Sequence, residues 1–99
     1  MGYNGEGHMR LIDFNLSVAA LDPQLKLYFK PADQAALPVS SLQLLNQWLI
    51  VVPGSSPLTL DQFEARVQAI SGSRQLAYSE TSQIKLFGYH LRDQKIILG

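Results

Sequence analysis

Side chains that carry out chemistry are sparse in this sequence of 99 residues. Its two histidines are His8 and His90, and cysteine is absent. The lack of cysteine excludes a thiol nucleophile, a disulfide framework and a cysteine-based zinc or iron–sulfur site. A histidine-based metal site needs two or three ligands that converge. His90 has no neighbour of this kind, so we expect it to be a structural or surface residue, and we expect no cofactor.

Catalytic patterns are equally weak. No Gly-x-Ser-x-Gly turn is present, and Asp93 lies too close to His90 in sequence to support a serine–histidine–aspartate triad. Glu64 and Glu80 could form an acid–base pair, but Glu64 falls on the polar side of an amphipathic helix, where solvated charges are usual. We therefore predict that the chain is not an enzyme, and a small enzyme built around His90 is the least favoured alternative.

One strand-like segment carries the strongest surface pattern. Lys26, Tyr28 and Lys30 alternate with apolar residues, which places an aromatic ring between two cations on one face. Such a stripe could stack a nucleic-acid base and contact phosphates, or contact an acidic protein. Strands that face water also carry Lys and Tyr routinely. Because eight Lys and Arg balance eight Asp and Glu, a nucleic-acid-binding module is the alternative function and not the favoured one.

The first half of the chain predicts a hairpin followed by a helix. Residues 10–18 and 25–30 both alternate between apolar and polar side chains, and Leu21-Asp22-Pro23-Gln24 supplies turn chemistry between them. Residues 40–52 have a capping box and leucines at helical spacing, which favours a helix. The apolar run at 48–52, which Pro53-Gly54 ends, fits a buried strand instead, so helix and strand both remain open for 47–52.

The second half predicts one helix and three strands. Thr59 begins a capping box, and Leu60, Phe63, Val67 and Ile70 form one helical stripe. Residues 75–80, 83–91 and 95–98 look extended, with a turn at 92–94. No internal repeat is evident. The sequence thus predicts a small single α+β domain with two helices on one face of a mainly antiparallel sheet of about five strands, in the order β-β-α-α-β-β-β.

The leading functional prediction is a non-enzymatic protein–protein interaction or assembly domain. If residues 40–52 form a helix, one leucine stripe covers the sheet and a second apolar face remains, formed by Leu44, Trp48 and Val51. Exposed apolar surface of this kind marks an interface, and a two-fold homodimer is the commonest way to cover it. If residues 48–52 form a central strand, the same side chains belong to the core.

The ends of the chain and its hydropathy set the remaining expectations. Three glycines in the first seven residues and the His8-Met9 pair predict that residues 1–9 are a flexible lead-in from a cloning vector, with a single globular domain at 10–99. No apolar run approaches the roughly 18 residues that a membrane span needs. A cytoplasmic location is the default expectation, although an excised extracytoplasmic domain would have the same features.

Overall fold

The computed structural model describes residues 9–99, so residues 1–8 of the predicted lead-in at 1–9 lie outside the described residues. The elements follow the order α1 (Leu11–Ser17), β1 (Lys26–Phe29), β2 (Leu37–Leu45), β3 (Trp48–Pro53), α2 (Leu60–Val67), β4 (Gln75–Tyr78), β5 (Ile84–Lys85), β6 (Tyr89–Arg92) and β7 (Lys95–Leu98). Among these residues, no helix combines the length and hydropathy needed to cross a bilayer.

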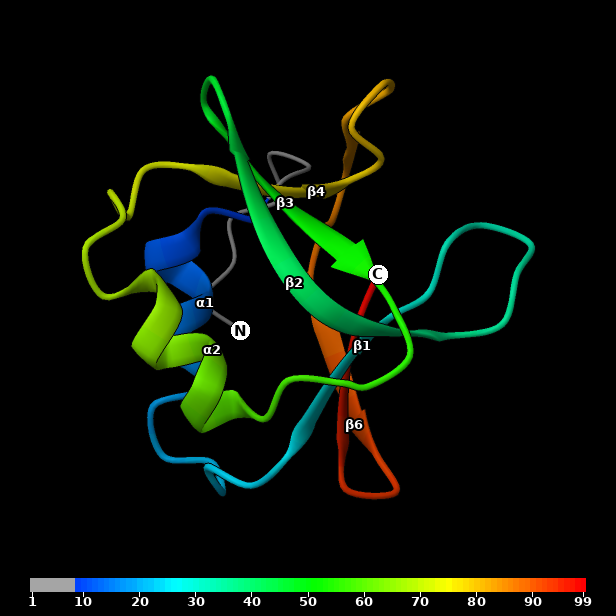
Figure 1. Cartoon of the computed structure of the whole chain (residues 1–99). Helices are drawn as coiled ribbons and strands as arrows, with labels where there is room; N and C mark the ends of the chain where they lie inside the picture. Colours follow the sequence, from blue (N-terminus) through cyan, green and yellow to red (C-terminus); the bar gives the residue numbers. More distant parts are fainter. Residues whose placement is uncertain (1–8) are drawn as a thin grey trace.

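All seven strands form one mixed, strongly curled half-barrel sheet in the order β5-β4-β3-β2-β1-β7-β6 (Figure 1). The β3–β4 and β1–β7 pairs are parallel and the other pairs are antiparallel. The two edge strands, β5 and β6, are consecutive in the chain. The residues between them bond to the strands next to these edges, since Leu86 N donates to Leu76 O in β4 at 3.0 Å and Phe87 N to Gly99 O, just after β7, at 2.8 Å.

The predicted order β-β-α-α-β-β-β, with about five mainly antiparallel strands, is therefore wrong. The first error is at 10–18, where the structure has helix α1 instead of a strand. Alternation at Ile12, Phe14 and Leu16 suggested a strand, but Leu11, Phe14 and Val18 are the buried residues, and their spacing is helical. Because this strand does not exist, β1 pairs with β2 and β7 instead of forming the predicted first hairpin.

The second error is at 40–52, where the favoured helix is a β-hairpin made of β2 and β3. Asn46 adopts φ 53° in its two-residue turn, a conformation that asparagine tolerates well. Leu49, Ile50 and Val51 are all buried, because β3 lies between β2 and β4 and is covered on both faces. A strand covered in this way needs a continuous apolar run, which explains the segment that also fitted a helix.

The later elements follow the sequence closely. Helix α2 has the predicted capping box, with Gln62 N donating to Thr59 Oγ1 at 3.2 Å and Thr59 N to Gln62 Oε1 at 3.0 Å. Strands β4, β5 and β7 lie within the segments predicted as extended. The segment predicted as one strand at 83–91 forms two, β5 and β6, and β6 continues to Arg92, the first residue of the predicted turn. The turn between β6 and β7 contains Asp93 and Gln94 with φ 52° and 64°.

The fold consists of two copies of one unit, which contradicts the prediction that no internal repeat exists. Helix α1 and strands β1–β3 make the first unit, and helix α2 and strands β4–β7 make the second. Parallel pairing has the same register in both, with Leu49 beside Leu76 and Ile96 beside Leu27. Bonds between the units are also reciprocal: Leu11 N donates to Arg74 O at 2.8 Å, and Leu60 N to Leu25 O at 2.7 Å. The units are therefore related by a pseudo-two-fold axis.

This repeat is nearly invisible in the sequence. Residues 9–30 correspond to 58–79, and residues 37–52 to 84–99. Only five of the 22 positions in the first alignment are identical, at Leu11/Leu60, Phe14/Phe63, Val18/Val67, Ala20/Ala69 and Leu27/Leu76. Residues matched in this way are called equivalent below.

Both helices lie together on the concave side of the sheet (Figure 1). Their inward residues and those of the strands form one core, and the rings of Phe14 and Phe63 meet edge to face with centroids 5.4 Å apart. Met9, which the sequence assigned to the lead-in, is buried in this core and accepts a bond from Leu76 N. The helices fill the concave side of the sheet.

Candidate functional site

Strand β1 presents the predicted Lys-Tyr-Lys stripe on the convex face. Leu27 and Phe29 are buried in the core, whereas Lys26 and Lys30 are exposed and Tyr28 is half-buried. The side chains of a strand alternate between its two faces, so these three residues share the convex side. The structure thus brings Lys26, Tyr28 and Lys30 to one surface.

Strands β7 and β6 extend this surface with cations that are distant in sequence. Lys95 lies beside Lys26 in the parallel β1–β7 pair, and Arg92 lies opposite Lys95 in the antiparallel β6–β7 pair. In the next convex row, Ile97 lies between Tyr28 and His90. We call this surface the basic face and define it by Lys26, Tyr28, Lys30, His90, Arg92 and Lys95.

The charges of the basic face work against folding. Neighbouring strands lie about 4.8 Å apart, so Lys26, Lys95 and Arg92 form a row of like charges across three strands. Directly paired like charges destabilise a sheet. Among the described residues, the salt bridge that reaches this face joins Arg92 Nε and Asp93 Oδ2 at 3.9 Å, and both side chains are more than 70% exposed. An ion pair this exposed stabilises the fold very little.

Tyr28 is the aromatic centre of the basic face. Lys95 Nζ lies 4.9 Å from the centroid of its ring, a cation–π contact that orients both groups. On the next strand, Ile97 is only 8% exposed and supplies a flat apolar neighbour. A half-buried ring beside a buried aliphatic side chain, ringed by cations, can hold a planar group against the sheet while the cations contact anionic oxygens.

The equivalent surface on β4, β3 and β2 provides an internal control for the basic face, which lies on β1, β7 and β6. At the positions equivalent to Lys26, Lys95 and Arg92 it has Gln75, Trp48 and Leu45, which pair in the same registers. The residues equivalent to Tyr28, Lys30 and His90 are Ala77, Ser79 and Gln43. The equivalent positions of the fold therefore carry none of these charges, so the cations are not required by the architecture.

The predicted apolar interface is not assembled as one surface. Val51 is 1% exposed and lies in the core, since residues 40–52 form strands instead of a helix. Leu44 is 48% exposed and pairs with inward-facing Leu49, whereas Trp48 pairs with Leu45 on the opposite face of the hairpin. Leu44 and Trp48 therefore point to different sides, and self-association stays a prediction without a defined surface.

The residues considered for catalysis are dispersed. His90 is exposed on the basic face, Glu80 is exposed in the turn after β4, and Glu64 lies between the two helices. Within residues 9–99, no three His, Asp or Glu side chains gather closely enough to hold a metal ion.

Sequence reasoning found half of the basic face and missed the rest. Alternation within one strand identified Lys26, Tyr28 and Lys30. His90, Arg92 and Lys95 join them only through the β1–β7 pairing, which connects opposite ends of the described chain. The internal repeat could have indicated this pairing from the sequence, because the motif Leu-x-x-Phe-x-x-x-Val occurs at both Leu11 and Leu60.

Comparison with known proteins adds no functional information. No family model, no curated protein and no solved structure matches this chain.

Proposed function

We propose that this domain binds single-stranded nucleic acid on its basic face. The observation that carries the proposal is the contrast between two equivalent surfaces. The cations of β1, β7 and β6 raise the free energy of the folded state, and the equivalent positions on β4, β3 and β2 lack them. A surface that the fold does not need, and that works against its stability, is best explained by an anionic partner.

The chemistry of the face favours a single strand over other anions. Lys26, Lys95 and Arg92 form a row of cations that can contact phosphates, and Tyr28 offers a ring on which a base can stack. Stacking on one aromatic side chain is sequence-tolerant, because every base has a π-face. Readers of duplex DNA commonly insert a helix into the major groove, whereas the cations of the basic face lie on strands β1, β7 and β6 and the residues next to them.

Binding to fluorescein-labelled oligothymidylate and oligouridylate, followed by fluorescence anisotropy over a range of NaCl concentrations, tests this proposal. For single strands the logarithm of affinity falls with the logarithm of salt by about 0.7 per neutralised phosphate. If Lys26, Lys30, Arg92 and Lys95 all engage, we expect a slope of about −3.

Paired charge reversals locate the site. The double variant Lys26→Glu/Lys95→Glu should abolish binding, and Arg66→Glu/Lys85→Glu, which makes the same change in net charge away from this face, should retain it. An absence of binding at low salt, or equal losses in both variants, contradicts the proposal. Stronger capture of polyglutamate than of either oligonucleotide assigns the face to an acidic protein instead.

A further inference from the structure

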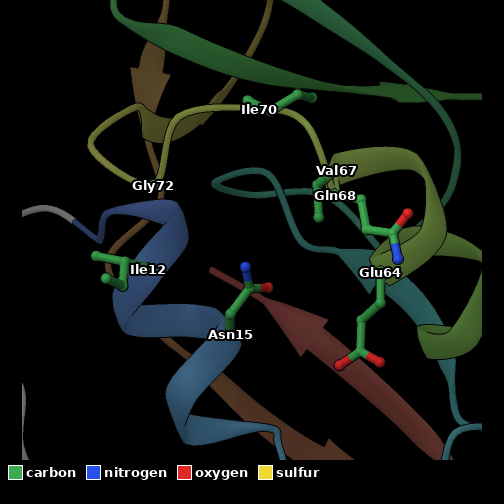
Figure 2. Close-up of a pocket in the computed structure, with 7 residues that line it drawn as sticks. All are labelled: Ile12, Asn15, Glu64, Val67, Gln68, Ile70 and Gly72. Atoms are coloured by element: carbon green, nitrogen blue, oxygen red, sulfur yellow. The ribbon is translucent and has the colours of Figure 1, made fainter.

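The groove between helices α1 and α2 carries no ligand proposal (Figure 2). Asn15 and Glu64 extend into it from the two helices, and its other walls are mostly apolar. Asn15 Oδ1 has no hydrogen-bond partner among the described residues, but it is buried from solvent, so a ligand in the groove could not reach it. The convex side of the sheet carries a clearer indication.

Phe87 presents a second aromatic ring beside the basic face. Its side chain is 51% exposed, although it is large and apolar. Leu86, which precedes it, is fully buried in the core, whereas Phe87 lies outside that core. Because successive side chains of an extended chain alternate between two faces, the ring of Phe87 points to the convex side.

A β-bulge sets the direction of this ring. Phe87 N and Gly88 N both donate to Gly99 O, at 2.8 and 3.3 Å, and Gly99 N donates to Gly88 O at 3.0 Å. Two residues of one strand thus oppose one residue of its neighbour, which defines a bulge, and bulges commonly re-aim a side chain. The equivalent part of the chain has the same irregularity, between Val39 and Ser41 in β2.

Lys30, the last cation along β1, lies level with this bulge. Lys30 N donates to Leu98 O at 2.8 Å, so Gly99 lies between Lys30 on one side and the bulge on the other. A Cβ added at Gly88 or Gly99 would meet no described atom within 4 Å. Open backbone without side chains therefore separates Lys30 from the ring of Phe87. Glycine in a strand often marks a place where a ligand approaches the backbone closely.

The equivalent bulge in β2 lacks both the ring and the glycine. The residues there that correspond to Phe87 and Gly88 are Ser40 and Ser41. The architecture thus requires neither an aromatic side chain nor a bare backbone at this point, just as it does not require the cations of the basic face.

We propose that Phe87 is a second base-stacking residue, so that the domain holds a segment of at least two unpaired nucleotides. One base stacks on Tyr28 and another on Phe87, and Lys30 contacts the phosphates between them. The strand passes over Gly88 and ends at Phe87. Strand β7 separates Tyr28 from the strand of Phe87, which places them about 10 Å apart across the sheet, so each ring serves a different base. This inference rests on the proposed function and extends the length of its site.

Fluorescence anisotropy with labelled oligothymidylate tests the role of the ring. Phe87→Ala should weaken binding about tenfold, the loss expected for one stacked base. Leu91→Ala is the matched control, because Leu91 is 50% exposed and pairs with core residue Ile96, on the opposite face of β6. It should retain wild-type affinity. Phe87→Ala removes no charge, so its salt dependence should equal that of the wild type.

An abasic strand of the same length, which has the phosphates and no bases, separates stacking from other effects. Phe87→Ala and the wild type should bind this strand equally. On oligothymidylate, the losses of Tyr28→Ala and Phe87→Ala should multiply in the double variant, since the rings serve different bases. An equal loss of Phe87→Ala on the abasic strand, or losses that do not multiply, would contradict a site with two stacked bases.

Gly88→Val tests the path of the strand. Valine suits an extended chain and has open space at this position, so the melting temperature should not fall. Affinity for oligothymidylate should fall, because the new side chain occupies the path to Phe87. Wild-type affinity in both Gly88→Val and Phe87→Ala, with the expected salt dependence retained, would overturn this inference and leave the proposed function standing. A wild-type chain that binds no oligothymidylate at low salt would overturn both.

Discussion

Tyr28 combines a ring on which a base can stack with a cation–π contact to Lys95. Its ring is half-buried and carries the Lys95 ammonium 4.9 Å from its centroid. Its hydroxyl plays no part in the proposed mechanism, since a base stacks on the ring and the cations bind phosphate. Ring and hydroxyl can therefore be tested separately.

Replacing Tyr28 with alanine should weaken binding to oligothymidylate by about tenfold, because base–aromatic stacking is worth about 1–3 kcal/mol per base. Tyr28→Phe keeps the ring and should retain wild-type affinity within about twofold. Fluorescence anisotropy at constant salt measures both variants. Equal losses in the two would show that the hydroxyl, and not the ring, contributes.

Single residues also show where sequence reasoning succeeds. The Thr59 capping box was readable because its partners lie three residues apart and their chemistry is local. Helix α1 was missed because Ile12 and Leu16 are apolar although their side chains are 44% and 72% exposed. Together with Phe14 they form an alternating apolar pattern, but the buried residues do not follow this alternation. Hydrogen bonds between residues close in sequence can be predicted from the sequence, whereas the exposure of an apolar side chain cannot.

Among the elements, the neighbouring strands β1, β7 and β6 determine both the stability and the proposed binding of the domain. The charged row across them is unfavourable for the sheet, and the equivalent row across β4, β3 and β2 is uncharged. Stability and affinity should therefore change in opposite directions when one of these charges is reversed.

Lys26→Glu should stabilise the fold by about 0.5–1 kcal/mol, because it replaces a like-charge pair with Lys95 by an opposite-charge pair. The same variant should lose at least tenfold in affinity for oligothymidylate. Thermal denaturation at low and high salt measures the gain, which should shrink as salt screens the pair. Gln75→Glu, at the equivalent position, should change neither property appreciably. A less stable Lys26→Glu protein would mean that the fold needs this cation.

The element pairings also explain what the sequence did not predict. In the sequence, helix α2 separates β3 from its partner β4, and most of the described chain separates β1 from its partner β7. A turn or a cap is determined by a few adjacent residues, but these registers depend on which distant strands meet. His90, Arg92 and Lys95 were therefore invisible as members of the site, although each lies in a segment predicted as extended or as its turn.

For the whole molecule, the pseudo-two-fold arrangement places both units in one core. Each helix entry bonds to the strand entry of the other unit, and the rings of Phe14 and Phe63 meet between them. Neither unit has a core of its own. Acidic residues gather near the helices, at Asp13, Asp22, Asp61 and Glu64, so a chain with zero formal net charge still carries a basic face on the other side.

Because the core is shared, Phe14→Ala and Phe63→Ala should each destabilise the entire domain by about 3–5 kcal/mol. Unfolding should remain a single transition, with far-UV and near-UV circular dichroism coinciding. The double variant should cost less than the two losses added together, since the rings contact one another. Two separated transitions would indicate that the units fold independently, which this architecture excludes.

The most direct test of the central claim is to map the contact surface of a short oligothymidylate on the ¹⁵N-labelled chain by NMR. The surface formed by β1, β7 and β6 is equivalent to the one formed by β4, β3 and β2, and only the first carries the cations. We expect perturbed amides at Lys26, Tyr28, Ile97 and Arg92, and unperturbed amides at the equivalent Gln75, Ala77, Ile50 and Leu45. Equal perturbation of both surfaces, or perturbation confined to the helices, would contradict the account.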